Sequence, residues 1–207
     1  MKNGKLFTIT GLLLIAAALC LTAYNVWDNR RAGEVADVIL EKIEIAENKA
    51  TPVEKIPETP PEKIEYPNYV LDPEREMPEE EVDDRGYIGV LSIPDLDREL
   101  PVQGEWSYPN LRVSPCRYVG SVYLDNMVIA AHNYTRHFGP LQSLGIGAEV
   151  IFTDIEGNVF TYRVAEIETL QPTAIEEMTE SEYDLTLFTC TIGGRSRVTV
   201  RCERVEE

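Results

Sequence analysis

Residues Glu149–Thr169, EVIFTDIEGNVFTYRVAEIET, decide the class of fold. Two runs within them, Glu149–Thr153 and Val159–Thr169, are rich in β-branched and aromatic residues, which is typical of strands. Between the runs, Asp154–Asn158 (DIEGN) predicts a hairpin turn, in which Gly157 supplies the positive φ that such turns need. The stretch therefore predicts a pair of strands joined by a turn.

Similar runs, separated by turn signals, continue in both directions from about Gly86 to the end of the chain. About eight strands in some 120 residues, with no helical repeat between them, favour a closed or nearly closed β-barrel over a parallel α/β sheet. We expect one helical turn, at Gly139–Leu144. The prediction is an all-β domain of eight strands at residues 86–207, and the other strands are Tyr87–Ile93, Leu100–Val102, Ser121–Tyr123, Met127–Ala131, Tyr183–Thr189 and Arg197–Arg204.

The N-terminal residues have a different composition. No charged residue occurs from Leu6 to Trp27, and residues 12–21 (LLLIAAALCL) are almost wholly aliphatic. A helix of about 20 such residues spans a hydrocarbon core of ~30 Å. A cleaved signal peptide, with Ala16–Ala18 before the cut, is the alternative, but the apolar run continues past that point. We therefore predict a transmembrane anchor at residues 1–27.

Residues 28–50 follow the anchor. Val35, Ile39, Ile43 and Ala46 recur there at near-helical spacing, with Glu and Lys between them. This predicts a short amphipathic helix beside the membrane. Its apolar stripe is either a packing surface or a binding surface for a partner.

Residues 51–85 hold much of the negative charge of the chain. Between Glu54 and Asp84 there are 12 acidic and three basic residues, and seven of the 13 prolines lie between residues 52 and 78. Proline favours extended backbone and like charges repel, so we expect a solvated linker. The alternative is that Asp72-Pro73 begins a lid over an active site.

The whole chain of 207 residues has a net charge of -17, with 36 acidic and 19 basic side chains. This charge repels phosphate backbones and argues against nucleic-acid binding. It also favours the imidazolium form of His132 and the neutral thiol of Cys190, although screening limits the effect to about 8 Å. We therefore predict that only a minority of the protein carries the thiolate and the imidazolium together at neutral pH.

Four cysteines and two histidines limit the reactive side chains. Cys20 lies in the anchor, which leaves an odd number in the β domain, Cys116, Cys190 and Cys202, so at least one is unpaired within a monomer. A bridge between Cys116 and Cys202 is one possibility. The other is that Cys202, on the apolar side of its strand, is a core residue.

Cys190 and His132 both fall where a predicted strand opens into a loop. Cys190 follows Thr189 and precedes a glycine-rich turn, and His132 follows the apolar run Val128–Ala131. Strand ends present side chains to a cleft while the strand holds them rigidly. His137 is the alternative histidine, but it lies five residues into the loop. The order and position of Cys190 and His132 are compatible with contact across adjacent strands.

The run Thr186–Cys190 (TLFTC) resembles the TLxTC signature of sortases, the membrane-anchored cysteine transpeptidases of Gram-positive bacteria. The resemblance extends to Gly89–Pro94 (GVLSIP), Ala131–Asn133 (AHN) and Arg197–Val200 (RVTV). The order and spacing agree over roughly residues 86–205. The fold class that this implies is a sortase-like β-barrel preceded by a transmembrane helix.

The resemblance implies a role for each matching residue. Cys190 would be the nucleophile, His132 the general acid and base, and Arg197 the group that binds substrate or the oxyanion. Thr189 would add a substrate-binding hydrogen bond. Arg195 and Arg201 are the alternatives to Arg197, but the first lies in the glycine-rich turn and the second is about 13 Å further along the strand.

The function implied is cleavage of an LPxTG-like sorting signal on secreted proteins and transfer to an amine, with the catalytic domain outside a single-pass membrane anchor. The acceptor would be a peptidoglycan precursor amine or a pilin lysine. The mechanism requires no metal or cofactor. A pilin-polymerising sortase, a hydrolytic cysteine peptidase and a non-catalytic binding barrel remain as alternatives. Two departures from the family pattern, Ala131 before the histidine and Ala148 after Gly147, affect the subclass.

Overall fold

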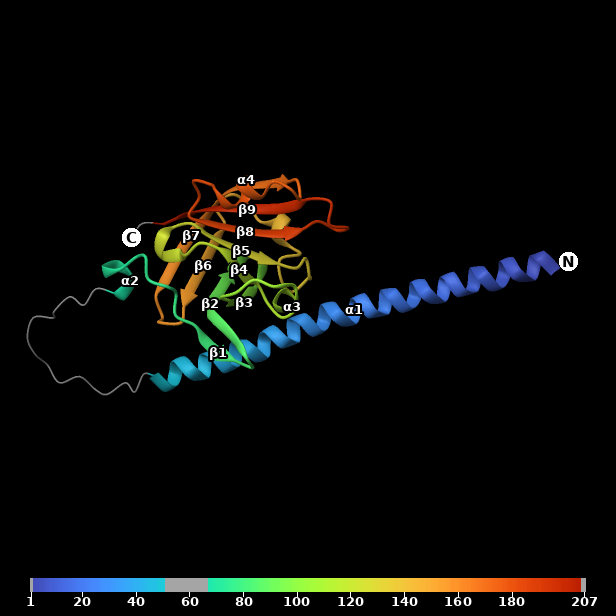
Figure 1. The fold of residues 1–207 in the computed structure, drawn as a ribbon, viewed down its shortest axis with the longest axis horizontal. Coiled ribbons are helices and arrows are strands. Elements are labelled where there is room, and N and C mark those ends of the chain that lie inside the picture. The colour runs from blue at the N-terminus through green and yellow to red at the C-terminus, as the bar shows by residue number, and fades with distance from the viewer. Residues whose placement is uncertain (1, 51–66, 206–207) are drawn as a thin grey trace, which may run out of the picture.

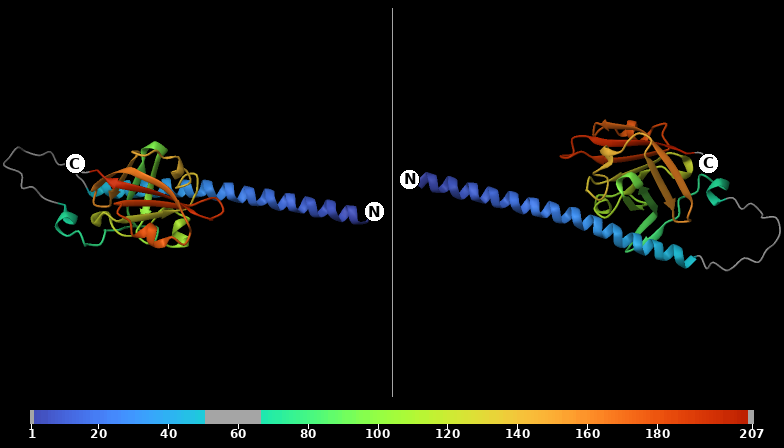
Figure 2. Two further views of the ribbon diagram at one scale, coloured as in Figure 1. Left: turned by 90° about the horizontal axis from the view of Figure 1, so that it is seen from above. Right: turned by 180° about the vertical axis from the view of Figure 1, so that it is seen from behind.

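The computed structural model describes residues 2–50 and 67–205, and the side chains of residues 7–43 and 67–205. One long helix, α1 (Lys2–Ala50), lies beside a β-barrel formed by the C-terminal part of the chain. The barrel contacts the C-terminal half of α1, and the N-terminal half projects beyond it (Figure 1). The same arrangement is visible from above and from behind (Figure 2).

Eight strands close the barrel, which confirms the predicted fold class. Their order is β2-β3-β4-β5-β8-β9-β7-β6, and pairing of β6 with β2 completes the circle. A short strand, β1 (Glu80–Val82), is added at the edge of β2. The barrel strands are β2 (Arg85–Ile93), β3 (Arg98–Gln103), β4 (Cys116–Val119), β5 (Met127–Ala131), β6 (Glu149–Asp154), β7 (Val159–Leu170), β8 (Leu185–Cys190) and β9 (Arg197–Arg204).

One predicted strand is wrong and one barrel strand was not predicted. Residues Val122–Leu124 form a 3₁₀ turn, because the Ser121 hydroxyl accepts a hydrogen bond from the Tyr123 backbone and Asp125 takes a left-handed conformation. The missed strand β4 is four residues long and contains Arg117, so its sequence lacks an apolar run. The turn between β6 and β7 is as predicted, with Gly157 at φ 84°.

The two faces of the barrel wall are distinct. Strand residues such as Ile129, Leu187 and Val200 belong to the interior core, together with Phe152 and Tyr162. The alternate residues on β5 and β8 point to the outer face, where a second apolar cluster contains Leu111, Cys116, Val128, Ala130, Leu170, Met178 and Phe188. Short elements cover this outer cluster, namely α3 (Tyr108–Leu111) and α4 (Ile175–Thr179).

Helix α1 packs on the barrel through the apolar stripe predicted for residues 28–50. Ile39 and Ile43 are buried in a cluster with Val82, Tyr87 and Val113 of the barrel side. Ala32 and Ala36 are also buried, at positions that bring the helix close to the barrel. The stripe is therefore a packing surface within the chain.

The apolar segment and the docked segment belong to one unbroken helix. Among the described residues, Phe7–Ile43 is long and apolar enough to cross a membrane. Apolar side chains in its first part are exposed, including Leu12, Leu13, Leu14, Leu19 and Leu21. In the described part of the chain these side chains pack on no other element, whereas the stripe from Ala32 onward packs on the barrel.

Residues 51–66 of the predicted linker lie outside the described residues. The rest of the linker prediction, up to residue 85, contains α2 (Asn68–Leu71), and its neighbours pack on the barrel. The ring of Tyr69 stacks on Tyr123 at 5.1 Å, and Met77 is 4% exposed in the interior core. Apolar side chains thus attach residues 69–77 to the barrel in spite of the surrounding charge.

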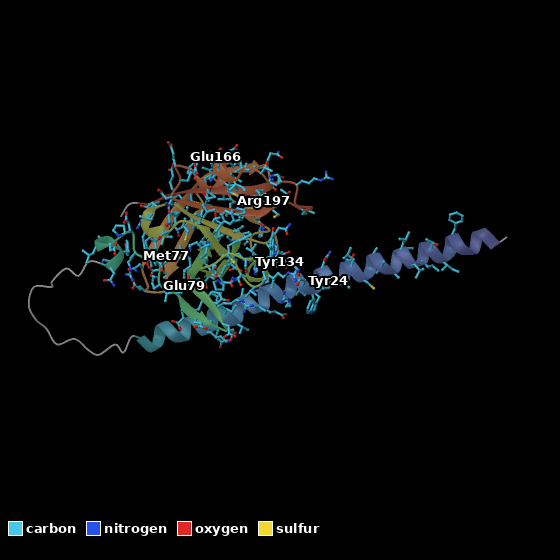
Figure 3. All side chains as sticks on the ribbon, viewed as in Figure 1. Tyr24, Met77, Glu79, Tyr134, Glu166 and Arg197 are labelled. Atoms are coloured by element: carbon cyan, nitrogen blue, oxygen red, sulfur yellow. The ribbon has the colours of Figure 1, made fainter. Side chains whose placement is uncertain are left out.

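Asp72-Pro73 lies far from the end of β8. Arg75 pairs with Glu156 in the turn between β6 and β7, and that turn is at the opposite end of the barrel from Cys190. Figure 3 shows Met77 at the end away from the β8–β9 turn. In this structure the segment therefore does not cover Cys190.

Candidate active site

Strand pairing brings the three predicted catalytic residues to one end of the barrel. Strands β5 and β8 are parallel, with Ala131 paired to Thr189, so His132 and Cys190 are the next residues on neighbouring strands. Strands β8 and β9 are antiparallel, and Cys190 is paired directly with Arg197. Adjacent strands are about 4.8 Å apart, so Cys190 lies one strand away from each of the other two.

These residues also share one face of the sheet. Cys190 has the same parity as Phe188, and Arg197 the same parity as Arg201, both on the outer face. His132 follows Val128 and Ala130 on that face. Among the described residues, no side-chain hydrogen bond joins Cys190 to His132 or Arg197 in this structure. The strand register thus brings the three residues to neighbouring positions at the strand ends.

A cavity of about 610 Å³ opens beside Cys190. It lies between the loop that follows His132 and the turn between β8 and β9, and its lining includes Asn133, Gln142, Thr189, Cys190 and Ile192. His132 and Arg197 do not line this cavity, since they lie on the outer face. Cys190 lines this cavity and is partly exposed.

Apolar and aromatic side chains form the outer face next to Cys190. Phe188 meets Tyr118 edge to face at 5.4 Å, and Tyr118 meets Trp106 in the same way at 5.6 Å. Val128 and Ala130 continue this surface on β5. Phe188, Val128 and Ala130 are buried beneath α3 and α4, so they support the strands next to Cys190 and are not themselves open to a substrate.

Thr189 is buried, and its hydroxyl donates a hydrogen bond to the Ala131 carbonyl at 2.8 Å. This bond joins β5 and β8 directly before His132 and Cys190. The predicted hydrogen bond from Thr189 to substrate would have to use another atom, because the hydroxyl proton is already donated. The position indicates that Thr189 holds the two strand ends in register.

The three candidate arginines have different surroundings. Arg195 is exposed in the turn, and Arg197 is half-buried, with its guanidinium donating to the backbone carbonyls of Gly194 and Ser196. Arg201 is 2% exposed and fully engaged by protein groups. Arg197 is therefore the one that combines pairing to Cys190 with donors close to solvent.

Arg201 attaches the connection between β7 and β8 to the barrel. Its guanidinium donates to the Glu168 carboxylate at 2.8 Å, to the Met178 carbonyl at 3.1 Å and to the Thr186 hydroxyl at 3.0 Å. It also donates to the Glu177 carbonyl. Because Glu177 and Met178 lie in the connection between β7 and β8, Arg201 fixes that connection against the face that holds Cys190.

Replacing Arg201 with methionine is expected to lower the free energy of unfolding by about 3 kcal/mol, since it leaves a partly buried carboxylate and two carbonyls without their donor. Arg204→Met is the matched control on the same strand. Arg204 pairs with Asp125, whose side chain is 44% exposed, so the control should cost less than about 1 kcal/mol. Denaturant unfolding of the full chain in detergent measures both, and equal losses would contradict the anchoring role of Arg201.

His132 is partly buried between the barrel and α1. Burial lowers its pKa below 6.5, and the nearby positive charge of Arg112 lowers it further, against an opposing effect of Asp28. The prediction that the net negative charge favours the imidazolium is wrong in direction, because local desolvation and one arginine outweigh distant, screened carboxylates. The neutral imidazole is therefore the main form at pH 7.

Contacts with α1 hold the loop after His132. The ring of Tyr134 lies 5.2 Å from that of His132, and its hydroxyl donates to Asp28 on α1 at 2.7 Å. Thr135 exchanges two hydrogen bonds with the Asn29 side chain. Arg136 binds both carboxylate oxygens of Asp37 at 2.8 Å. The helix thus supports the loop that carries the candidate acid and base.

His137, the alternative histidine, takes part in this docking and lies away from the site. It is 1% exposed, and its Nε2 lies 3.3 Å from the Ala32 carbonyl of α1, so that Nε2 carries the proton and donates. Burial lowers its pKa to about 4. A buried histidine with this partner holds two elements together and has no access to a substrate.

The lowered pKa of His137 predicts a loss of stability in mild acid. The unfolded chain binds a proton below about pH 6.5 and the folded chain only near pH 4, so stability is complete above pH 6.5 and falls as the pH decreases towards 4. We expect His137 to contribute a decrease of about 2 kcal/mol between pH 7 and pH 5. His137→Gln should remove most of this slope in denaturant titrations, whereas His132→Gln should keep it. An unchanged slope in His137→Gln would contradict the assignment.

All four cysteines are free, so the bridge between Cys116 and Cys202 is not formed. Cys116 belongs to the outer cluster and Cys202 to the interior core, on opposite faces of the barrel wall. Burial raises the pKa of each to about 12. Within the β domain, Cys190 is therefore the thiol that solvent can reach.

The sequence did not indicate Asp28, Tyr134, Arg112 or the anchoring role of Arg201. Asp28 is 106 residues from Tyr134, and only the docking of α1 brings the two together. An exposed arginine after an apolar turn, such as Arg112, has no sequence feature that separates it from other surface arginines. For Arg201 one sequence signal was available: side chains alternate between the faces of a strand, so Arg201 lies on the same face as Arg197.

Comparison with known proteins identifies the family of the fold. A family model described as Sortase domain matches residues 91–205. Similar solved structures include sortase C1 from Streptococcus agalactiae, with 28% identity and a TM-score of 0.53 over 61% of this chain and 72% of that one. Sortase C-3 from Streptococcus pneumoniae has 27% identity and a TM-score of 0.53 over 65% and 72%.

Sortase A from Corynebacterium diphtheriae shares the fold at 23% identity, with a TM-score of 0.53 over 59% of this chain and 62% of that one. A search of curated proteins gave no match. The family match covers more than half of the chain and includes the strands that carry Cys190, His132 and Arg197.

Proposed function

The chain belongs to the sortase family, and from this premise we propose that it is a membrane-anchored cysteine transpeptidase in which Cys190, His132 and Arg197 perform the chemistry. The observation that carries the proposal is the strand register, which brings His132, Cys190 and Arg197 to the same end of one face of the sheet. A barrel that only binds peptides would not require a thiol, an imidazole and a guanidinium in adjacent positions.

The proposed first step is acylation of Cys190. His132, which is mainly neutral at pH 7, takes the thiol proton, and the sulfur attacks the carbonyl carbon of the scissile peptide bond. Arg197 donates hydrogen bonds to the oxygen that becomes negatively charged. The C–N bond then breaks, the His132 imidazolium gives its proton to the departing amine, and the peptide remains on Cys190 as a thioester.

In the proposed second step an amine resolves the thioester. His132 takes a proton from the attacking amine, the new C–N bond forms, and the C–S bond breaks to release the Cys190 sulfur, which recovers the proton. The substrate would be a secreted protein with an LPxTG-like sorting signal. The acceptor would be a peptidoglycan precursor amine, and the product a protein attached to the cell wall.

The second candidate acceptor is a pilin lysine. Its support is that sortase C1 and sortase C-3 are among the similar structures above 25% identity. The segment of Asp72-Pro73 gives it no support, because it does not cover Cys190. Water as acceptor would make the protein a hydrolytic peptidase.

We further propose that the apolar part of α1 spans the membrane once and that the barrel lies on the outer side. Exposed leucines between residues 12 and 21 support the span. Secreted substrates and cell-wall amines occur only outside, which sets the side on which the barrel must lie. Residues 1–27 would then be the anchor, residues 28–50 the docked helix, residues 51–85 the connection and residues 86–207 the catalytic barrel.

Mass spectrometry of the full chain in detergent tests the function. The protein is incubated with a panel of sorting-signal peptides, each with no amine, with a peptidoglycan-type stem peptide, or with a lysine-containing pilin peptide. A thioester on Cys190 that is converted to an amide in one amine arm supports transpeptidation and identifies the acceptor. Release of free acid at equal rates in all arms indicates hydrolysis, and absence of any adduct on a thiol that alkylates freely would count against the proposal.

A further inference from the structure

A second cavity lies between α1 and the barrel, on the side of α1 that carries Asp28. It has a volume of about 580 Å³, and three arginines line it: Arg31 from α1, Arg85 from the start of β2 and Arg112 after α3. Aromatic rings of Tyr24, Trp27 and Tyr108 complete much of the wall. The chemical step proposed above uses none of these side chains.

The charge of this cavity is opposite to that of the chain. Three guanidiniums face one carboxylate, that of Asp28, in a protein whose net charge is -17. Asp28 is already bound by Arg31 at 3.1 Å and by the Tyr134 hydroxyl. The excess positive charge is therefore not balanced by acidic residues of the cavity wall.

Several donors of these arginines are not used within the described part of the chain. Arg112 is exposed, and its guanidinium has no hydrogen bond or ion pair there. Arg85 has one long hydrogen bond, to the Asp83 carbonyl at 3.4 Å. The buried Nε of Arg31 has no partner. Guanidinium groups bind phosphate oxygens with paired hydrogen bonds, so this set of donors matches a phosphate group.

The aromatic residues place the cavity at a membrane surface. Tyr24 and Trp27 end the apolar segment, and their rings lie 6.0 Å apart with more than half of each side chain exposed. Such rings are enriched at the level of lipid headgroups. The guanidinium of Arg31 lies 5.7 Å from the Trp27 ring centre, so the charged and aromatic parts are continuous. Figure 3 shows Tyr24 where α1 leaves the barrel.

We propose that this cavity binds the phosphate group of a membrane lipid, with Arg31, Arg85 and Arg112 as its donors. The lipid chain would lie along Tyr24 and Trp27, in the direction of the apolar half of α1. The inference rests on the proposed membrane placement of α1 and does not depend on peptide transfer. Two lipid classes carry the required group, anionic phospholipids and polyprenyl diphosphates.

A phosphate bound in the cavity should change the pKa of His132 through Arg112. The positive charge of Arg112 lowers the pKa of His132, so a phosphate bound to that arginine would offset the effect. The pKa of His132 should therefore rise when the cavity is filled. His137 is buried elsewhere and serves as an internal reference in the same spectrum.

Trp27 provides a direct probe, because the chain has two tryptophans and Trp106 lies elsewhere. Full-length Trp106→Phe protein in uncharged detergent is titrated with short-chain phosphatidylglycerol, geranyl diphosphate, short-chain phosphatidylcholine and inorganic phosphate while Trp27 fluorescence is recorded. NMR of the two histidines follows the pKa of His132 in the same samples. Neither readout requires transpeptidase activity, so failure of the proposed function would not affect them.

The expected result is saturable binding of phosphatidylglycerol, of geranyl diphosphate or of both, and weaker binding of phosphatidylcholine. Whichever of phosphatidylglycerol and geranyl diphosphate binds more tightly identifies the lipid class. Arg85→Gln and Arg112→Gln should each weaken binding about tenfold, while Arg163→Gln, the matched control on β7, should not. Circular dichroism checks that each variant is folded. Equal responses to all four probes, inorganic phosphate binding as tightly as the lipids, or affinities unchanged in folded Arg85→Gln and Arg112→Gln would overturn the proposal.

Discussion

Replacing Cys190 with alanine should abolish the thioester adduct and reduce transpeptidation at least about 10³-fold, since the covalent intermediate requires a nucleophile at this position. The other thiols of the β domain cannot substitute for it. Cys116 and Cys202 are both 0% exposed, and burial raises the pKa of each to about 12. Turnover of a quenched peptide substrate and mass spectrometry of the acyl-enzyme measure the two effects.

Cys20→Ala is the matched control for Cys190→Ala. It is the same change at the other cysteine that is not buried within the protein, 170 residues earlier in the chain and in the apolar part of α1. We expect it to keep the full rate and the full yield of adduct. Substantial turnover in Cys190→Ala, or an adduct on another cysteine in the wild-type protein, would show that the nucleophile has been assigned incorrectly.

Arg197→Lys should reduce the rate of acylation about 10²- to 10³-fold while the charge is kept. Lysine has one ammonium in place of a planar fork of donors, so it cannot keep the two backbone hydrogen bonds of Arg197 and also point donors at the oxyanion. The loss should appear mainly in kcat, because the interaction strengthens only when charge develops on the substrate oxygen. Single-turnover formation of the acyl-enzyme is the measurement.

Arg195→Lys, two residues earlier in the same turn, is the control for this change. Arg195 is exposed and lies outside the paired part of β9, so its replacement should change the rate less than about twofold. Equal losses in the two variants would mean that the turn as a whole, and not the guanidinium opposite Cys190, supports acylation.

The parts of the fold that were predictable have a strong local signal. Residues Met127–Ala131 and Arg197–Arg204 were predicted as strands with the bounds that they have, because each is a β-type run ended by a loop. The four residues of β4 have no such run, and the segment Ser121–Tyr123 was misassigned because its turn depends on a side-chain hydrogen bond. The hydrophobic pattern alone predicts neither the strand β4 nor this turn.

In the candidate site, too, some features have a local sequence signal and others depend on distant contacts. Cys190 and His132 stand at strand ends that are readable from sequence, and the roles of these two residues and of Arg197 followed from the resemblance of their motifs to sortases. Their surroundings depend on docking: Asp28 and Arg112 reach His132 only when α1 and α3 are placed against the barrel. For this reason the predicted effect of net charge on His132 had the wrong direction, since the local environment could not be known.

The docking of α1 limits how far the catalytic end can stand from the bilayer. Asn29 binds the loop after His132 only two residues beyond Trp27, which is about 3 Å of helix. The turn between β8 and β9 lies on the side of the barrel that faces the N-terminal half of α1 (Figure 2). With that half in the membrane, the distance of Cys190 from the bilayer is set by a rigid helix and not by the length of the acidic connection. Substrates would then have to present the cleavage site close to the lipid surface, as a protein still held by its own C-terminal anchor does.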